Sequence, residues 1–332
     1  MMKSYWLKTP ELTQGTETSL ELRDTPIPDP GPKQLLVRVR AAGLNRGEFL
    51  KGGLHKPGAV KAVGTEAAGE VVRAGADVKK FAVGDRVMGR MAGAFAEYAL
   101  VDETEAMAMP ARLSWEEAAS IPLTFHVVYD MLVIQGQLKP GEWLLINGVS
   151  SGVGVAAVQM AKALGANVIG TSGSADKLER MKAIGLDVGL CTRAPDFAAR
   201  VMEATGGHGA DLVINTVGGT VFAEAMRCMA FEGRLAMVGY VDEVTHSDID
   251  LTALHTKRLR LFGVSNKLRT PAQRMQAVPQ FIKDMLPRIA DGSVRVMLDK
   301  VFPFEQLAEA KAHMEANQHL GKIVLAGVPN HS

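Results

Sequence analysis

The spacing of hydrophobic and polar positions changes at Ser114. Before it, short apolar runs at 35–40, 68–73 and 85–88 are separated by glycine, proline and aspartate. Such runs are typical of β-strands joined by tight turns. Frequent glycines between short strands indicate a barrel-like or sandwich-like unit. We therefore predict that the first region is β-rich.

From Ser114 onward, apolar strands alternate with helices. Ser114 and Glu117 have the spacing of a capping box, which opens a helix. The alternation after it predicts a parallel sheet with helices on both faces. Strands are predicted at 143–147, 167–171, 211–215, 234–239 and 259–264, and helices at 153–164, 175–184, 197–205 and 222–230.

The last part of the chain is mixed again. Thr270 caps a further helix with Pro271 in its first turn, and Pro279 and Pro287 are expected to divide it. A strand at 299–302, a helix at 305–315 and a strand at 322–326 are predicted to follow.

The order of these regions predicts one domain inserted in another. The predicted fold is α/β, a doubly wound Rossmann sheet at 126–298 inserted in a β-rich, barrel-like domain that comprises 1–125 and 299–332. We expect the active site in the cleft between the two domains.

Composition excludes several classes of partner. The 37 Lys and Arg residues nearly cancel the 36 Asp and Glu residues, which argues against nucleic acid or an anionic membrane as partner. Cys191 and Cys228 are too few for a disulfide framework, and residues 1–6 lack a secretory signal, so we expect a cytoplasmic protein. The uncharged stretch 143–161 contains a polar turn, which favours a buried strand and helix over a membrane span.

That stretch carries a glycine-rich turn between a strand and a helix. Glycines allow a phosphate to approach the backbone, and the helix start points free N–H groups at the anion. Against G-x-G-x-x-G, the first two glycine positions hold Val149 and Ser151, so the match is to a looser form built on Gly148, Gly152 and Gly154. The hydroxyls of Ser150 and Ser151 are expected to donate to a pyrophosphate.

The end of the next strand indicates which dinucleotide binds. An NAD site places an acid about 20 residues after the glycines, whereas this chain has Ser172, Gly173 and Ser174 there. Neutral hydroxyls with Lys177, and Arg193 after the following strand, favour NADP(H). A solvated helix charge is the alternative interpretation of Lys177.

Several segments together carry a family resemblance. They are 41–46, 64–71, the glycine turn, 215–219 and 320–325, and they resemble the medium-chain dehydrogenase/reductase superfamily along nearly the whole chain. The ending at 310–317 is similar to the p53-inducible quinone oxidoreductase-like group of its zinc-free quinone oxidoreductase branch.

The resemblance implies a GroES-like catalytic domain, a homodimer and a small-molecule substrate, namely a quinone or a similar conjugated carbonyl. It also implies a set of cofactor-binding positions beside the turn and strand ends, which with the hydroxyls above are Asn45, Ser150, Ser151, Gly152, Val153, Ser172, Gly173, Ser174, Lys177, Thr192, Thr216, Val217, Gly239, Tyr240, Val264 and Ser265.

Zinc is not expected, because other residues stand at the positions of the zinc ligands. Zinc-dependent relatives place Cys and His where this chain has Asn45 and Thr65, and Glu66 alone remains. Without a Lewis acid, the easier acceptors are those that delocalise the incoming charge. We predict a zinc-independent NADPH-dependent oxidoreductase that reduces quinones or similar conjugated carbonyls by hydride transfer.

The candidate hydrogen-bond donors are few. By resemblance, Asn45 lies beside the nicotinamide and donates to the substrate, although it could instead stabilise a turn. Leu50 replaces a tyrosine of many relatives, and Thr124 or Tyr129 is left to compensate. Two alternatives remain open: an enone or enoyl-thioester reductase, and a non-catalytic NADPH-binding protein like the lens crystallins of this branch.

Overall fold

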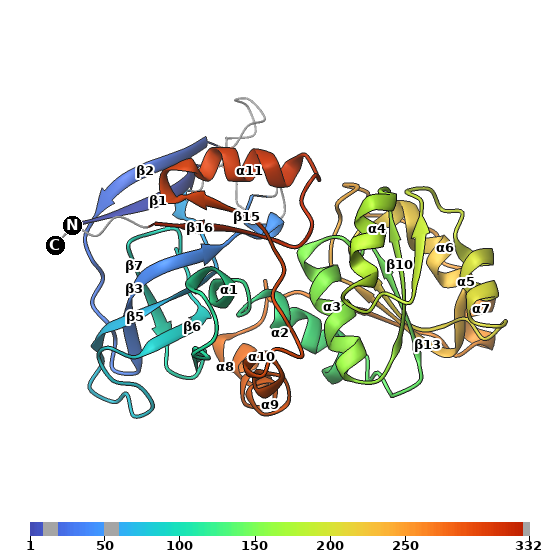
Figure 1. The fold of residues 1–332 in the computed structure, drawn as a ribbon, viewed down its shortest axis with the longest axis horizontal. Helices are drawn as coiled ribbons and strands as arrows, with labels where there is room; N and C mark the ends of the chain where they lie inside the picture. The colour runs from blue at the N-terminus through green and yellow to red at the C-terminus, as the bar shows by residue number, and fades with distance from the viewer. Residues whose placement is uncertain (9–18, 50–59, 328–332) are drawn as a thin grey trace. The chain divides into compact units, whose positions relative to one another are not determined.

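The computed structural model describes residues 1–8, 19–49 and 60–327. These residues form two compact units. The first consists of described residues within 1–123, 278–290 and 296–327, and the second consists of residues 124–277 and 291–295. The colours in Figure 1 show that the green-to-orange second unit interrupts the first in the sequence.

The first unit is built on β-sheets. Its larger sheet has the order β15-β16-β3-β5-β6-β8, with β7 also paired to β3, and a smaller sheet has the order β2-β1-β4. The antiparallel pair β3 and β5 contains two register shifts, which bend the strands around the core. The elements are β1 (Met2–Lys8), β2 (Ser19–Thr25), β3 (Gln34–Gly43), η1 (Arg46–Glu48), β4 (Val60–Ala62), β5 (Glu66–Ala74), β6 (Arg86–Arg90), β7 (Tyr98–Asp102), β8 (Ala106–Ala108), α1 (Trp115–Ala119), α9 (Val278–Asp284), α10 (Leu286–Ala290), β15 (Leu298–Pro303), η4 (Phe304–Gln306), α11 (Leu307–Glu315) and β16 (Lys322–Ala326).

The second unit is a parallel sheet of order β11-β10-β9-β12-β13-β14. Figure 1 shows α3 and α4 on one side of this sheet and α5 and α6 on the other. The predicted fold class, a parallel Rossmann sheet with a β-rich unit, is confirmed. The elements are α2 (Thr124–Tyr129), η2 (Asp130–Ile134), β9 (Trp143–Asn147), α3 (Gly152–Ala163), β10 (Asn167–Ser172), α4 (Ala175–Lys182), β11 (Val188–Cys191), α5 (Ala198–Ala204), β12 (Ala210–Asn215), η3 (Gly219–Val221), α6 (Phe222–Arg227), β13 (Met229–Met237), α7 (Leu251–Thr256), β14 (Arg260–Gly263) and α8 (Pro271–Met275).

Local capping signals correctly predict where α1 and α8 begin. Ser114 and Glu117 form the predicted capping box at the start of α1, and Thr270 caps α8 with Pro271 in its first turn. Pro279 and Pro287 lie near the starts of the separate helices α9 and α10, so the predicted division of this region is confirmed.

One predicted helix is too long. The expected helix at 222–230 ends at Arg227, because β13 already begins at Met229. Met229 pairs with Ala210 at the start of β12. Sheet pairing therefore takes residues that the local sequence alone allows to be helical.

The uncharged stretch 143–161 folds as predicted, as strand β9 followed by most of helix α3. Throughout the described ranges, no helix combines the length and the apolar character that a membrane crossing requires.

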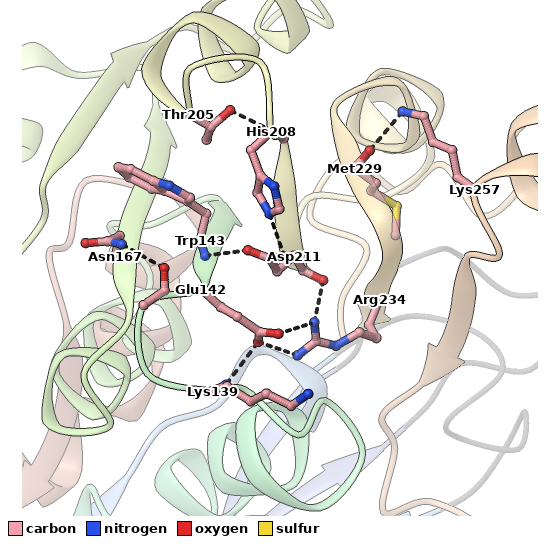
Figure 2. Close-up of polar contacts among 12 residues, drawn as sticks. Lys139, Glu142, Trp143, Asn167, Thr205, His208, Asp211, Met229, Arg234 and Lys257 are labelled. Carbon is pink, nitrogen blue, oxygen red and sulfur yellow. Dashed lines mark hydrogen bonds and ion pairs between the residues drawn. The ribbon is translucent and has the colours of Figure 1, made fainter.

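A polar network ties the second unit together near the starts of β9 and β12 (Figure 2). The buried guanidinium of Arg234 donates to the carboxylate of Glu142, with the closer contact at 2.6 Å, and to the carbonyl oxygens of Gly136 and Asp211. The carboxylate of Asp211 accepts from the backbone N–H of Trp143 at 2.8 Å. Because charges and peptide groups satisfy one another here, three neighbouring strands are locked in register.

Candidate functional site

The turn between β9 and α3 requires glycine at its first position. Gly148 has φ +80°, and a Cβ there would lie 2.4 Å from Oγ1 of Thr216. A side chain would therefore be strained and would displace the hydroxyl that donates to the carbonyl oxygen of Asn147 at 2.8 Å. The chain can turn sharply here only because the residue is Gly.

The start of α3 is capped and tightly wound. The hydroxyl oxygen of Ser151 accepts from the N–H of Gly154 at 3.0 Å, which leaves the hydroxyl hydrogen for donation. A Cβ on Gly154 would lie 2.3 Å from the carbonyl oxygen of Val149. Gly152 and Val153 form the first turn of the helix. The helix N-terminus thus keeps the geometry that favours an anion.

The end of β10 lies beside this turn. Ser172 is its last residue, and its hydroxyl is 3.4 Å from that of Ser150. Ser174 caps α4 by accepting from the N–H of Lys177. These hydroxyl groups come from neighbouring parallel strands and meet at the same edge of the sheet.

Two cations belong to this edge. Lys177 is half-buried in the first turn of α4. The side chain of Arg193 packs directly on Gly173, since a Cβ on that glycine would lie 2.0 Å from the arginine Nε. Thr192 donates its hydroxyl hydrogen to Asp196 at 2.7 Å. Arg193 therefore covers the serine-rich turn at which the cofactor is expected.

The remaining predicted positions follow the ends of β12, β13 and β14. Asn215 shapes the turn after β12, because its Oδ1 accepts from the N–H groups of Val217 and Gly218 at 2.9 and 3.0 Å. Asn215 was not among the predicted site residues, although a buried Asn at a strand end is the available signal. The positions that the same sheet edge carries are Thr216, Val217, Gly239, Tyr240, Val264 and Ser265.

One buried atom at this edge lacks a partner within the described part of the chain. It is Oδ1 of Asn147, the last residue of β9, whose side chain is fully buried. An unsatisfied buried acceptor is costly. Together with the tight glycine turn and the capped start of α3, it makes the edge a good fit for a dinucleotide with hydrogen-bond donors.

In the first unit, Asn45 belongs to a buried polar cluster with Glu66 and Lys322. Asn45 precedes η1, and its Nδ2 donates to Oε1 of Glu66 at 2.9 Å. The ammonium of Lys322 donates to the same carboxylate oxygen at 2.7 Å and to Oδ1 of Asn45 at 2.9 Å. Lys322 belongs to the segment 320–325 that carries part of the family resemblance, and it was not singled out as a site residue. The feature that could have marked it is a charge at the start of an apolar strand.

Glu48 adds a second acid to this cluster. Its carboxylate accepts from the hydroxyl of Thr65 and, at 2.9 Å, from the backbone N–H of Asn45. Burial raises the pKa of Glu48 to about 7, against the opposing effect of these hydrogen bonds. Glu48 therefore exchanges a proton near neutral pH.

The expected proton donors on α2 are packed rather than exposed. Thr124 is 3% exposed and Tyr129 is fully buried, as expected for a helix packing residue. Burial lowers the pKa of the neighbouring His126 to about 4, so this imidazole is neutral at pH 7. Leu50, which replaces a tyrosine of many relatives, lies outside the described residues.

The described residues contain no cluster of metal ligands, and one of the two cysteines is buried. Within 1–8, 19–49 and 60–327, no three His, Cys, Asp or Glu side chains are grouped so that they could hold a metal ion. Burial raises the pKa of the Cys228 thiol to about 12, which keeps it protonated, while Cys191 is exposed.

Comparisons with known proteins match both units. A model of the alcohol dehydrogenase GroES-like domain matches residues 31–111, and a model of the zinc-binding dehydrogenase domain matches residues 152–284. One phenolphthiocerol/phthiocerol polyketide synthase polypeptide of Mycobacterium tuberculosis is 31% identical over 91% of this chain, and the chain spans 14% of the length of that relative.

Solved structures resemble the chain over its whole length. The quinone oxidoreductase of Pseudomonas syringae pv. tomato is 29% identical with a TM-score of 0.84, and 99% of this chain and 100% of that one are covered. The Escherichia coli quinone oxidoreductase complexed with NADPH is 26% identical with a TM-score of 0.85, again over 99% and 100% of the two chains.

Proposed function

The chain belongs to the medium-chain dehydrogenase/reductase superfamily, and from this premise we propose that it is a zinc-independent oxidoreductase that uses NADP(H) to reduce quinones or similar conjugated carbonyls. The observation that carries the proposal is the capped turn between β9 and α3, which winds tightly because Gly148 and Gly154 pack without a Cβ against Thr216 and Val149. The NADPH bound to the similar Escherichia coli quinone oxidoreductase supports it.

The end of β10 supports the phosphorylated cofactor. An acid there would accept from ribose hydroxyls and would repel a 2′-phosphate. The chain instead has the hydroxyls of Ser172 and Ser174, with Arg193 packed on Gly173 and Lys177 on the adjoining helix. We assign the 2′-phosphate to these cations. The pyrophosphate is assigned to Ser150, Ser151 and the N–H groups at the start of α3.

Asn45 is the proposed hydrogen-bond donor to the acceptor. When bound, NADP(H) would supply a hydride, and the acceptor would take up negative charge on a carbonyl oxygen. An amide N–H can hold that oxygen without a proton leaving the protein. Asn45 and Thr65 stand where zinc-dependent relatives place ligands, and neither an amide nor a hydroxyl is a usual zinc ligand. Acceptors that delocalise charge are therefore favoured over simple ketones.

The proposal is tested by screening acceptors while following NADPH absorbance. We expect 1,2-naphthoquinone to oxidise NADPH in the presence of the protein, with NADH much less effective. Asn45→Ala should lower kcat by about 100-fold, the usual cost of losing an oxyanion donor. Preference for NADH would contradict the assigned phosphate site. NADPH binding without oxidation by any acceptor would favour the non-catalytic alternative.

A second candidate function is reduction of an enone or enoyl thioester. The observation in its favour is the 31% identity to a polyketide synthase over 91% of this chain. The same donor geometry at Asn45 would serve, because the enolate formed from a conjugated carbonyl also carries part of its negative charge on the carbonyl oxygen. The two functions are distinguished by measuring kcat/KM for a crotonyl thioester and for 1,2-naphthoquinone at the same NADPH concentration. The acceptor with the larger kcat/KM identifies the function.

A further inference from the structure

The ammonium of Lys322 is enclosed by oxygen atoms inside the first unit. Its Nζ donates to Oε1 of Glu66 at 2.7 Å, and to the carbonyl oxygen of Leu44 and Oδ1 of Asn45 at 2.9 Å each. The side chains of Lys322 and Glu66 are 6% and 0% exposed. Three acceptors match the three N–H bonds of an ammonium group, so the buried charge is both paired and solvated by the protein.

The second oxygen of Glu66 is also engaged. Its Oε2 accepts from the backbone N–H of Leu123 at 2.7 Å. A Cβ on Gly43 would lie 2.8 Å from Oε1 and 2.7 Å from the carbonyl oxygen of Ala119. The carboxylate is therefore held from several sides, by one backbone N–H at Oε2 and by two side-chain donors at Oε1.

These contacts leave the Asn45 amide one orientation. Its oxygen faces the Lys322 ammonium, which can only donate, and its nitrogen faces the Glu66 carboxylate, which can only accept when ionised. A rotated amide would place N–H against the ammonium and C=O against the carboxylate. Both contacts would then be repulsive, so the two charges select the same rotamer.

We propose that Lys322 and Glu66 are positioning residues that hold Asn45 as a hydrogen-bond donor toward the acceptor's carbonyl oxygen. This inference rests on the proposed function. The ammonium on the amide oxygen polarises the group, and hydrogen bonds in such a chain strengthen one another. Lys322 thereby places a positive charge one amide away from the charge that develops on the acceptor.

A buried ion pair is weak evidence for a role in stability. Withdrawing two charges from water can cost as much as their attraction returns, and an apolar pair of the same volume is often at least as stable. Removing one partner leaves an uncompensated charge, so single substitutions report folding rather than chemistry. The informative variant removes both charges at once.

The first test uses Glu66→Gln combined with Lys322→Met, without cofactor. Protein labelled with ¹⁵N at asparagine is examined by NMR, and the Asn45 side-chain signal is identified as the one that Asn45→Ala removes. We expect hydrogen exchange of this amide to accelerate at least about tenfold in the double variant. The exposed pair on α11 gives the matched control, Lys311→Met with Glu315→Gln, which should leave the signal unchanged. Unchanged exchange in the test variant would overturn the proposal.

The second test is kinetic. With 1,2-naphthoquinone, the double variant should lose about tenfold in kcat while KM for NADPH stays within about twofold. In the Asn45→Ala background the same double substitution should have no further effect on kcat, because the amide through which the pair acts is already absent. Equal losses in both backgrounds would show that the pair acts elsewhere and would refute the assignment.

A conservative variant covers the case in which the double variant does not fold. Lys322→Arg keeps the charge and should retain most of the amide's exchange protection and most of the unsubstituted protein's kcat. Loss of protection in folded Lys322→Arg would count against the assignment. If the unsubstituted protein reduces no acceptor, the proposed function fails, whereas the NMR result still decides whether Lys322 and Glu66 hold Asn45.

Discussion

Glu48 makes the stability of the first unit depend on pH. Burial raises its folded-state pKa to about 7, from an ordinary value of 4.5. The folded state therefore keeps a proton that the unfolded chain loses first. This contribution to stability is fully present below pH 4.5 and is lost as pH rises to about 7, by about 3 kcal/mol in total.

Hydrogen exchange of amide groups in β3 and β5 at about pH 5 and about pH 8 measures this change. We expect faster opening at the higher pH, after correction for the intrinsic exchange rate. Glu48→Gln cannot ionise and should remove the difference. If the unsubstituted protein and Glu48→Gln show the same pH dependence, another group is responsible.

Arg193 is expected to control the choice of cofactor. Its side chain covers Gly173 at the serine-rich turn. Arg193→Ala should raise the Kd for NADPH about tenfold, the worth of one charge-assisted contact, and leave the Kd for NADH within about twofold. Fluorescence titration of the reduced nicotinamide gives both values. Arg180→Ala, on an exposed part of α4, should change neither.

Individual residues were predictable to different degrees. Lys177 and Ser172 follow from counting along a known strand–turn–helix pattern, and Asn45 follows from resemblance. The contacts of Lys322 could not be predicted, because its partners Glu66 and Leu44 are brought to it by the pairing of β3 with both β16 and β5. Contacts between distant segments leave no local periodicity in the sequence.

Among the elements, the turn before α3 tolerates little change. A Cβ on Gly154 would lie 2.3 Å from a backbone carbonyl oxygen, which cannot move aside as a side chain could. Gly154→Ala should weaken NADPH binding by at least about tenfold, because the helix start must shift. Isothermal titration calorimetry measures the loss. The control is Gly263→Ala, where nothing lies within 4 Å of the added carbon.

The network of Figure 2 should be the main polar support of the second sheet. Arg234 is 6% exposed at its side chain and pairs with Glu142 at 2.6 Å. Arg234→Met should lower the free energy of unfolding by about 3–5 kcal/mol, since the buried carbonyl groups and the carboxylate lose their donor. Urea unfolding measures it. Arg200→Met, which breaks an exposed pair on α5, should cost less than about 1 kcal/mol.

The elements of the second unit were predictable because their patterns are long and locally consistent. Strand β9 and helices α3 and α8 carry their own caps or apolar runs, as does α1 of the first unit. Several strands of the first unit were not singled out, among them β1, β2 and β4. Their side chains mix charge and apolarity, as in Met2–Lys8, and their pairing with one another supplies the missing information.

For the whole molecule, we expect a homodimer formed at the edge of the second sheet. Strand β14 ends the strand order, and Leu261 and Phe262 on it are only half-buried. An unprotected edge is a template for pairing with a second chain. Analytical ultracentrifugation should therefore give twice the chain's mass of 35.5 kDa. Phe262→Lys should shift it toward monomer, and the exposed Leu268→Lys should not.

Closure of the first unit has a consequence for synthesis. Strand β16 completes the larger sheet beside β3, and Lys322 at its head neutralises the buried Glu66. During translation strands β1 to β8 are made long before β16, so Glu66 lacks its cationic partner until β16 has emerged from the ribosome. The intervening Rossmann unit can meanwhile fold as the nascent chain lengthens. A chain that ends before β16 should therefore have a folded second unit and a first unit that is vulnerable to proteolysis.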